Sequence, residues 1–158
     1  MKIFKDKICI KWVVFSELTG IISGFLSIKG MQVFNETQQN APLTPPGWVF
    51  PVVWTILYAL MGIGACLVDK KNNTNSSSCC LNLFVAQLIV NFFWSLIFFN
   101  ALAYLGALIW LTILWILVFV MTLCYSKISK TAAWLQVPYL IWLSFALYLN
   151  AAVLLLNS

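Results

Sequence analysis

The chain has 158 residues, of which 63% are hydrophobic and 8% are charged, and its mean hydropathy is +0.96. A soluble domain is about half apolar and about a quarter charged, so most of this protein's surface must face lipid. The net charge of +5 is the balance of nine lysines and four acidic residues, and the chain has no arginine or histidine. Because the lysines lie between apolar runs, the charge does not indicate nucleic-acid binding.

Five apolar runs approach or exceed the ~20 residues that a helix needs to cross a bilayer. We predict spans over residues 8–28, 47–68, 79–99, 103–125 and 132–156. The first run is too long for the apolar part of a signal peptide, and it contains Glu17, so we interpret it as a retained span. The predicted fold is an all-α integral membrane protein, a single five-helix transmembrane bundle over residues 1–158.

The lysines predict the orientation of the bundle. With five spans, eight lysines share the side of the N terminus, including Lys2, Lys5 and Lys70, and only Lys29 lies on the other side. Lysine and arginine accumulate on the cytoplasmic side of membrane proteins, so we expect a cytoplasmic N terminus. Lysine without arginine, with abundant Asn and Ile, is typical of an AT-rich genome and favours a bacterial cell membrane.

The first span combines a small-residue stripe with an acid. Gly20 and Gly24 form a GxxxG pattern, which predicts a packing face toward another span or a second subunit. Glu17 lies near the middle of the span, where an ionised carboxylate costs several kcal/mol and no ion-pair partner is visible. We expect Glu17 to be protonated, or to face a polar cavity or a subunit interface, and we treat it as a functional candidate.

The second span is preceded by proline and glycine residues that are compatible with the start of a helix. Pro45 and Pro46 precede it, where a missing N–H costs nothing, and Gly47 allows a sharp turn. Pro51, Trp54 and Tyr58 then follow i, i+3, i+7 spacing on one face of the helix. Trp54 lies about two turns inside the span, deeper than tryptophans at the headgroup level.

Two later spans place polar or small residues beside aromatic ones. Gln87 and Asn91 lie one turn apart on a stripe that continues to Trp94 or Ser95 and Phe98, and Trp142 and Ala146 lie one turn apart in the last span. The amides either bond to neighbouring helices or orient a buried ligand. Together the three spans predict a pocket for a flat, largely apolar ligand, because aromatic faces suit planar rings.

No other chemistry is indicated. The five cysteines show no CxxC spacing, and four of them lie in or beside apolar runs, so we predict that they serve as small hydrophobic filler. Without histidine the commonest ligand for haem iron or zinc is missing. We therefore predict no catalytic and no metal-ligating residue.

Three stretches together resemble one known family: "PPGWVFPVVWTILYALMG" (45–62), "QLIVNFFWSLIFF" (87–99) and "VPYLIWLSFALYLN" (137–150). In this order, and over most of the chain, they are similar to the translocator protein family, also called tryptophan-rich sensory proteins. The resemblance implies an often homodimeric five-helix bundle whose pocket is covered by the first long loop, here residues 29–46. It also implies binding of porphyrins, including protoporphyrin and haem, as ligands rather than as obligatory cofactors.

The resemblance also implies roles for particular residues. By motif position, Trp54 and Trp142 are the tryptophans implicated in porphyrin binding, Asn91 contacts a ligand carbonyl, and Ala146 belongs to the last pocket wall. The complete set of expected ligand-binding residues is Trp54, Asn91, Trp142, Ala146, Tyr58, Gln87, Phe50 and Pro46.

The first loop departs from the family pattern. The family often has Trp-Tyr and later Lys-Pro before the double proline, whereas this chain has Phe34-Asn35 and Ala41-Pro42. The loop therefore lacks the lysine that could meet a porphyrin carboxylate. No basic residue follows Tyr148, so the sterol-recognition pattern is also absent.

Three functions follow as hypotheses. The first is binding of porphyrin or haem-type tetrapyrroles for transport, sensing or stress regulation, with membrane lipid and a second subunit as further partners. The second is an enzyme that degrades protoporphyrin in light, which would depend on the ligand's own photochemistry because no nucleophile–base pair is visible. The third is a membrane scaffold in which the pocket is vestigial.

Overall fold

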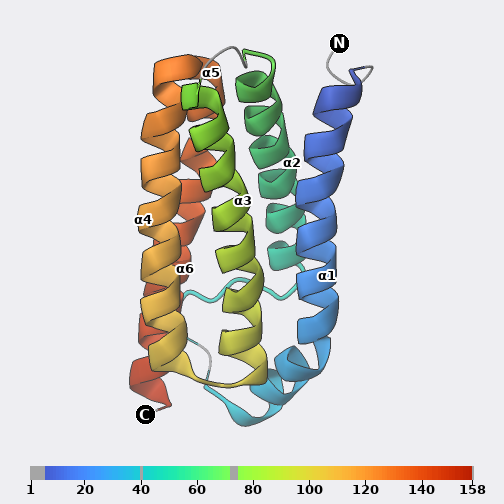
Figure 1. The fold of residues 1–158 in the computed structure, drawn as a ribbon. Helices are drawn as coiled ribbons and strands as arrows, with labels where there is room; N and C mark the ends of the chain where they lie inside the picture. The colour runs from blue at the N-terminus through green and yellow to red at the C-terminus, as the bar shows by residue number, and fades with distance from the viewer. Residues whose placement is uncertain (1–5, 40, 72–74, 158) are drawn as a thin grey trace.

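A computed structural model describes residues 6–39, 41–71 and 75–157. Within these residues five helical segments are long and apolar enough to cross a membrane, which confirms the predicted fold class. The elements are α1 (Lys7–Thr37), α2 (Val49–Asp69), α3 (Asn75–Ser95) with its π-helical end η2 (Leu96–Asn100), α4 (Tyr104–Ile128), α5 (Lys130–Trp134) and α6 (Val137–Leu156). The long helices run alternately down and up one bundle, so α1 begins at one end and α6 finishes at the other (Figure 1).

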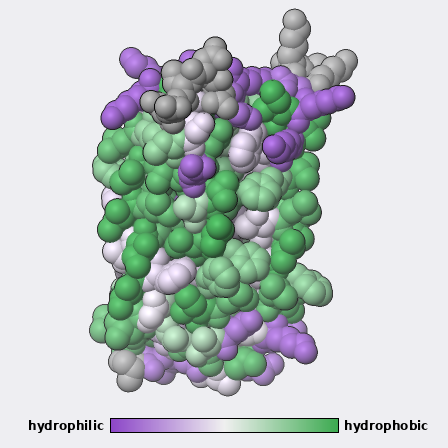
Figure 2. All heavy atoms as spheres, viewed as in Figure 1, coloured by the Kyte–Doolittle hydropathy of each residue, from purple (hydrophilic) through white to green (hydrophobic). Residues whose placement is uncertain are grey.

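The surface has the distribution that a membrane protein requires. Figure 2 shows a broad hydrophobic belt around the middle of the bundle, with hydrophilic residues gathered at both ends of the face in view. Large apolar side chains point outward, among them Ile141, Leu105 and Ile109 with exposed fractions of 66%, 60% and 56%. Such side chains are stable outside only when lipid surrounds them, because no water then has to solvate them.

The first helix is longer than the predicted first span. It continues past residue 28 to Thr37, so only residues 38–48 connect α1 to α2. Hydropathy reports only the length of the apolar run. The polar residues that follow it can still continue the same helix, so the run underestimates the helix. Gly30 fixes this extension, since a Cβ at that position would lie 2.6 Å from the backbone oxygen of Phe99 in η2. The predicted lid, residues 29–46, is therefore helical in its first half and a loop only in its second half. Asn40, which belongs to this second half, lies outside the described residues.

The predicted last span is divided in two. Residues 135 and 136 separate the short α5 from α6, and Pro138 lies in the first turn of α6. Proline is tolerated at this position because the first N–H groups of a helix have no intrahelical partner. Pro138 therefore lies at the start of a helix and does not interrupt one. Trp142 and Ala146 follow it in α6, about one and two turns further along.

The cysteines correct the sequence prediction. Cys9 pairs with Cys66 and joins α1 to α2, and Cys80 pairs with Cys124 and joins α3 to α4. Four of the five are therefore disulfide-bonded rather than hydrophobic filler, while Cys79 is free and exposed. Disulfides persist mainly in oxidising compartments, whereas both pairs lie at the lysine-rich end that is predicted to be cytoplasmic. Labelling of Cys79 by a membrane-impermeant maleimide in intact cells decides between the two orientations.

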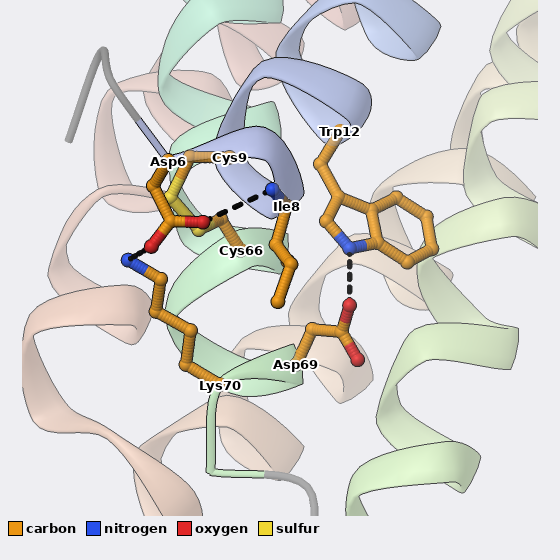
Figure 3. Close-up of a disulfide and its surroundings, with 7 residues drawn as sticks. All are labelled: Asp6, Ile8, Cys9, Trp12, Cys66, Asp69 and Lys70. Atoms are coloured by element: carbon orange, nitrogen blue, oxygen red, sulfur yellow. Dashed lines mark hydrogen bonds and ion pairs between the residues drawn. A yellow bond between two sulfur atoms is a disulfide. The ribbon is translucent and has the colours of Figure 1, made fainter.

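Polar contacts at the same end join the first two helices (Figure 3). The Lys70 ammonium lies 2.6 Å from the Asp6 carboxylate, and the indole N–H of Trp12 donates to Asp69 at 2.8 Å. The hydrogen bond from Lys70 lowers the pKa of the Asp6 carboxyl, so this ion pair is complete at neutral pH and is lost only as the pH falls through that lowered value. Lys2 and Lys5, which the orientation prediction counts, lie outside the described residues.

Candidate ligand-binding site

The bundle contains a cavity of about 790 Å³ in the half that adjoins the loop between α1 and α2. Its wall is formed by four helices and this loop. Each helix contributes several residues, for example Glu17 of α1, Trp54 of α2, Asn91 of α3 and Trp142 of α6. Binding sites for small molecules typically have ~300–1,000 Å³ and mostly apolar walls with a few polar groups. The cavity meets both conditions.

Six of the eight predicted site residues lie in the cavity wall, and two do not. The six are Trp54, Asn91, Trp142, Ala146, Tyr58 and Phe50. Gln87 is fully buried behind the wall, and Pro46 is outside the wall although its neighbours Pro45 and Gly47 belong to it. The structure thus brings together residues from three helices that are up to 96 positions apart in the sequence, from Phe50 to Ala146.

Aromatic rings line the cavity in groups that hold one another in place. The ring of Trp54 lies 5.6 Å from that of Tyr58 and 6.1 Å from that of Tyr139, measured between centroids. One turn earlier on α2, the ring of Phe50 lies 5.9 Å from that of Trp142 on α6. Tilted and edge-on pairs at these distances are favourable, so the indoles are oriented before any ligand enters.

The indoles of Trp54 and Trp142 differ from those of three other tryptophans in the bundle. Trp12, Trp110 and Trp115 each donate their indole N–H to an oxygen, at 2.7–2.9 Å. By contrast, within the described part of the chain the indole N–H groups of Trp54 and Trp142 have no hydrogen bond. A half-buried indole N–H usually finds a partner, so these two donors are available to a guest in the cavity.

A hydrogen-bonded chain behind the wall orients Asn91. The Asn91 side-chain amide donates to the Tyr139 hydroxyl at 2.9 Å, and this hydroxyl donates to the Gln87 side-chain oxygen at 3.2 Å. Gln87 in turn donates toward the sulfur of Met61 at 3.6 Å. Because the single proton of Tyr139 goes to Gln87, Asn91 must present its NH₂ group to Tyr139, and its oxygen accepts no hydrogen bond among the described residues.

We expect Tyr139→Phe to lower the free energy of unfolding by about 1.5 kcal/mol, since it leaves the buried amide groups of Gln87 and Asn91 without this partner. Thermal unfolding in detergent measures the effect. Tyr125→Phe is the matched control, because the Tyr125 hydroxyl is buried without any hydrogen bond among the described residues. Its removal should cost nothing. Equal losses in both variants would show that the chain through Tyr139 does not contribute to stability.

The first helix contributes more to the wall than its sequence indicated. Gly20 packs as predicted, since a Cβ there would lie 2.2 Å from the Tyr58 ring. Gly24 does not, because a Cβ there would meet nothing within 4 Å, and it lines the cavity instead. Glu17 also lines the cavity, which agrees with one of the environments expected for it. Phe34, expected in the loop, lies in α1 and faces the cavity from there.

The loop below the cavity is attached to the last helix. The Tyr148 hydroxyl donates to the Pro42 carbonyl at 3.2 Å, and the Asn157 amide exchanges two hydrogen bonds, of 2.8 and 3.1 Å, with the backbone of Gln39. These contacts hold the connection between α1 and α2 across the end of the bundle. Thr44, Pro45 and Gly47 of this connection complete the cavity wall.

The sequence model of the TspO/MBR family matches residues 12–156, which covers every helix that lines the cavity. The chain belongs to the TspO/MBR family. Among curated TspO/MBR proteins, it is 43% identical to the "Tryptophan-rich protein TspO" of Chlorobaculum tepidum over 117 residues, which are 72% of each chain. It is 37% identical to the protein of that name from Archaeoglobus fulgidus, over 88% of this chain and 90% of that one.

The chain is also similar to animal proteins. The chain is 38% identical to the human "Translocator protein" over 111 residues, which are 69% of this chain and 66% of that one. The TspO/MBR assignment and the five apolar helices together establish a multi-pass membrane protein. The three stretches on which the resemblance was recognised all lie inside the matched region.

Proposed function

We propose that the cavity binds a planar tetrapyrrole of the porphyrin or haem type, and that this TspO/MBR protein uses the bound ligand for transport, sensing or stress regulation. The observation that carries the proposal is the position of Trp54 and Trp142, whose indoles face one cavity from different helices with unpaired N–H groups. Flat aromatic faces bind a planar macrocycle by stacking, and the cavity volume of about 790 Å³ is sufficient for a ligand of this class.

The polar groups of the wall are few and fixed. Asn91 offers an oxygen whose direction is determined by Tyr139, and the two indoles offer N–H donors. Such a site gives orientation through single hydrogen bonds and affinity through buried apolar area. The described residues contain no group of three or more His, Cys, Asp or Glu side chains that could hold a metal ion.

Titration of the detergent-solubilised protein with protoporphyrin in darkness tests the proposal. We expect quenching of tryptophan fluorescence with a dissociation constant in the micromolar range, which is about −8 kcal/mol. Trp54→Phe and Trp142→Phe should each weaken binding about 5-fold, because each removes an indole face and a donor worth about 1 kcal/mol.

Trp134→Phe is the control, since Trp134 lies on α5 away from the cavity and is 72% exposed. It should bind as the unchanged protein does. The same titration under illumination separates the alternatives: loss of porphyrin absorbance only in light, and only with both indoles intact, would favour the degrading enzyme. Absence of quenching at every soluble porphyrin concentration would refute tetrapyrrole binding and leave the scaffold hypothesis.

A further inference from the structure

Among the described residues Glu17 is the one acid that lies within the apolar belt, and it has no polar partner there. Asp6 bonds to Lys70 and Asp69 accepts from Trp12, both at the end of the bundle, while Glu36 is exposed in the last turn of α1. Glu17 instead lies ten residues into a helix of the apolar belt, lines the cavity, and has no hydrogen bond or ion pair. An acid at this depth is costly, and its side chain is oriented toward the space that a guest would fill.

The position of Glu17 along α1 places it at the end of the cavity far from the loop. The adjacent Ser16 hydroxyl donates to the Tyr58 carbonyl at 2.8 Å, which fixes Glu17 level with the innermost cavity residue of α2. The lining residues of α1 then continue to Asn35, about 27 Å along the helix axis, where the loop residues Thr44 and Pro45 close the other end. We call the region around Glu17, Tyr58 and Asn91 the inner end of the cavity.

No cation accompanies this acid. Among the described residues of the wall none is a lysine, and the chain contains no arginine or histidine. The nearest lysine in sequence along α1, Lys29, is exposed and is not part of the wall. A ligand carboxylate at the inner end would lose its hydration, meet only neutral donors such as the Tyr58 hydroxyl and the indole N–H groups, and lie near another carboxyl group.

The second polar group of the inner end is also an acceptor. The side-chain oxygen of Asn91, a residue of the wall, accepts no hydrogen bond in the described part of the chain, while one N–H of its NH₂ group donates to Tyr139. An acid and an amide oxygen on facing helices suit a ligand group that donates hydrogen bonds, such as a pyrrole N–H or a protonated amine. The same pair offers a carboxylate no cation and at most the second N–H of the Asn91 amide.

We propose that the inner end of the cavity is a subsite for a neutral or cationic nitrogen donor, with Glu17 as its partner, and that it excludes anionic groups. This inference rests on the proposed function and specifies its ligand class. A tetrapyrrole then binds with its ring nitrogens toward the inner end and its carboxylates toward the loop, and a form whose carboxylates are esterified binds more tightly than the free acid. Planar cationic aromatics become ligands as well.

Three probes test this subsite by tryptophan quenching: protoporphyrin, its dimethyl ester, and the planar cationic dye acridine orange. We expect the ester to bind at least 10-fold more tightly than the free acid. Glu17→Gln should weaken the dye at least 10-fold, because an amide cannot form an ion pair, while leaving the thermal midpoint unchanged since Glu17 has no partner to lose. Glu36→Gln makes the same chemical change on the same helix outside the cavity, and it should bind the dye normally.

The new ring in Gly24→Phe would occupy the cavity, so any quenching that remains in this variant comes from probe dissolved in the detergent. This background is subtracted from the quenching of the other proteins. A free acid that binds as tightly as the ester overturns the subsite, and so does equal dye binding in the unchanged protein and Glu17→Gln. In both cases porphyrin binding itself, and with it the proposed function, would still stand. Failure of both protoporphyrin and its ester to quench the unchanged protein would refute the proposed function as well, even if the dye binds. The ester comparison requires no variant, so it remains decisive if Glu17→Gln does not fold.

Discussion

Gly24→Phe should reduce protoporphyrin affinity at least about 100-fold, a loss of about 2.7 kcal/mol, while the protein remains folded. Gly24 lies on the cavity wall, and a Cβ at this position would meet nothing within 4 Å. The new ring therefore enters open space rather than a packed core, and it occupies volume that a planar ligand needs. Replacement of a helical glycine also favours the folded helix by about 0.5 kcal/mol.

The same quenching titration measures the loss, and thermal unfolding checks the fold. Ile22→Phe is the matched control, because Ile22 is half exposed on the lipid-facing side of the same helix and lies outside the cavity wall. Gly24→Ala adds a single methyl group and should have a small effect on affinity. Undiminished binding by Gly24→Phe would mean that the porphyrin binds elsewhere on the protein, whatever the position of Trp54 and Trp142.

The architecture was predictable because lipid imposes a simple requirement on the sequence. Each crossing needs a continuous apolar run, and such runs are visible without knowledge of their neighbours. The runs did not show where a helix continues beyond the apolar segment, as α1 does to Thr37, because that depends on the contact of Gly30 with η2. The disulfides could not be predicted for a related reason: Cys9 and Cys66 are 57 residues apart, and no spacing rule connects them.

The wall of the cavity was predictable where one helix face carries both an aromatic and a polar residue. Trp54, Asn91 and Trp142 were found in this way, and the structure places all three in the wall. Gln87 shares the stripe of Asn91, one turn away, yet it lies behind the wall, because Tyr139 from another helix is inserted beside it. Which of two amides faces a cavity depends on tertiary packing, and a single helix pattern does not contain that information.

Gly62→Ala should lower the free energy of unfolding by about 2–3 kcal/mol, although alanine is the better helix former. A Cβ at Gly62 would lie 2.5 Å from the Cα and 2.8 Å from the backbone nitrogen of Val13 in α1. Backbone atoms cannot rotate away, so α1 and α2 must separate. Close approach through small residues is a main source of helix association in lipid, and here one methyl group removes it.

The separation should reach the candidate site as well. The Ser16 hydroxyl lies 2.8 Å from the added methyl group and donates to the Tyr58 carbonyl, also at 2.8 Å, so the link that fixes the inner end of the cavity is displaced with α1. We therefore expect Gly62→Ala to weaken porphyrin binding together with stability, whereas Gly24→Phe weakens binding alone. Gly106→Ala in α4 is the control for helix propensity, since a Cβ there meets its nearest neighbour at an ordinary 3.9 Å. Thermal unfolding that gives the same midpoint for Gly62→Ala and Gly106→Ala would show that the contact between α1 and α2 is not what stabilises this half of the bundle.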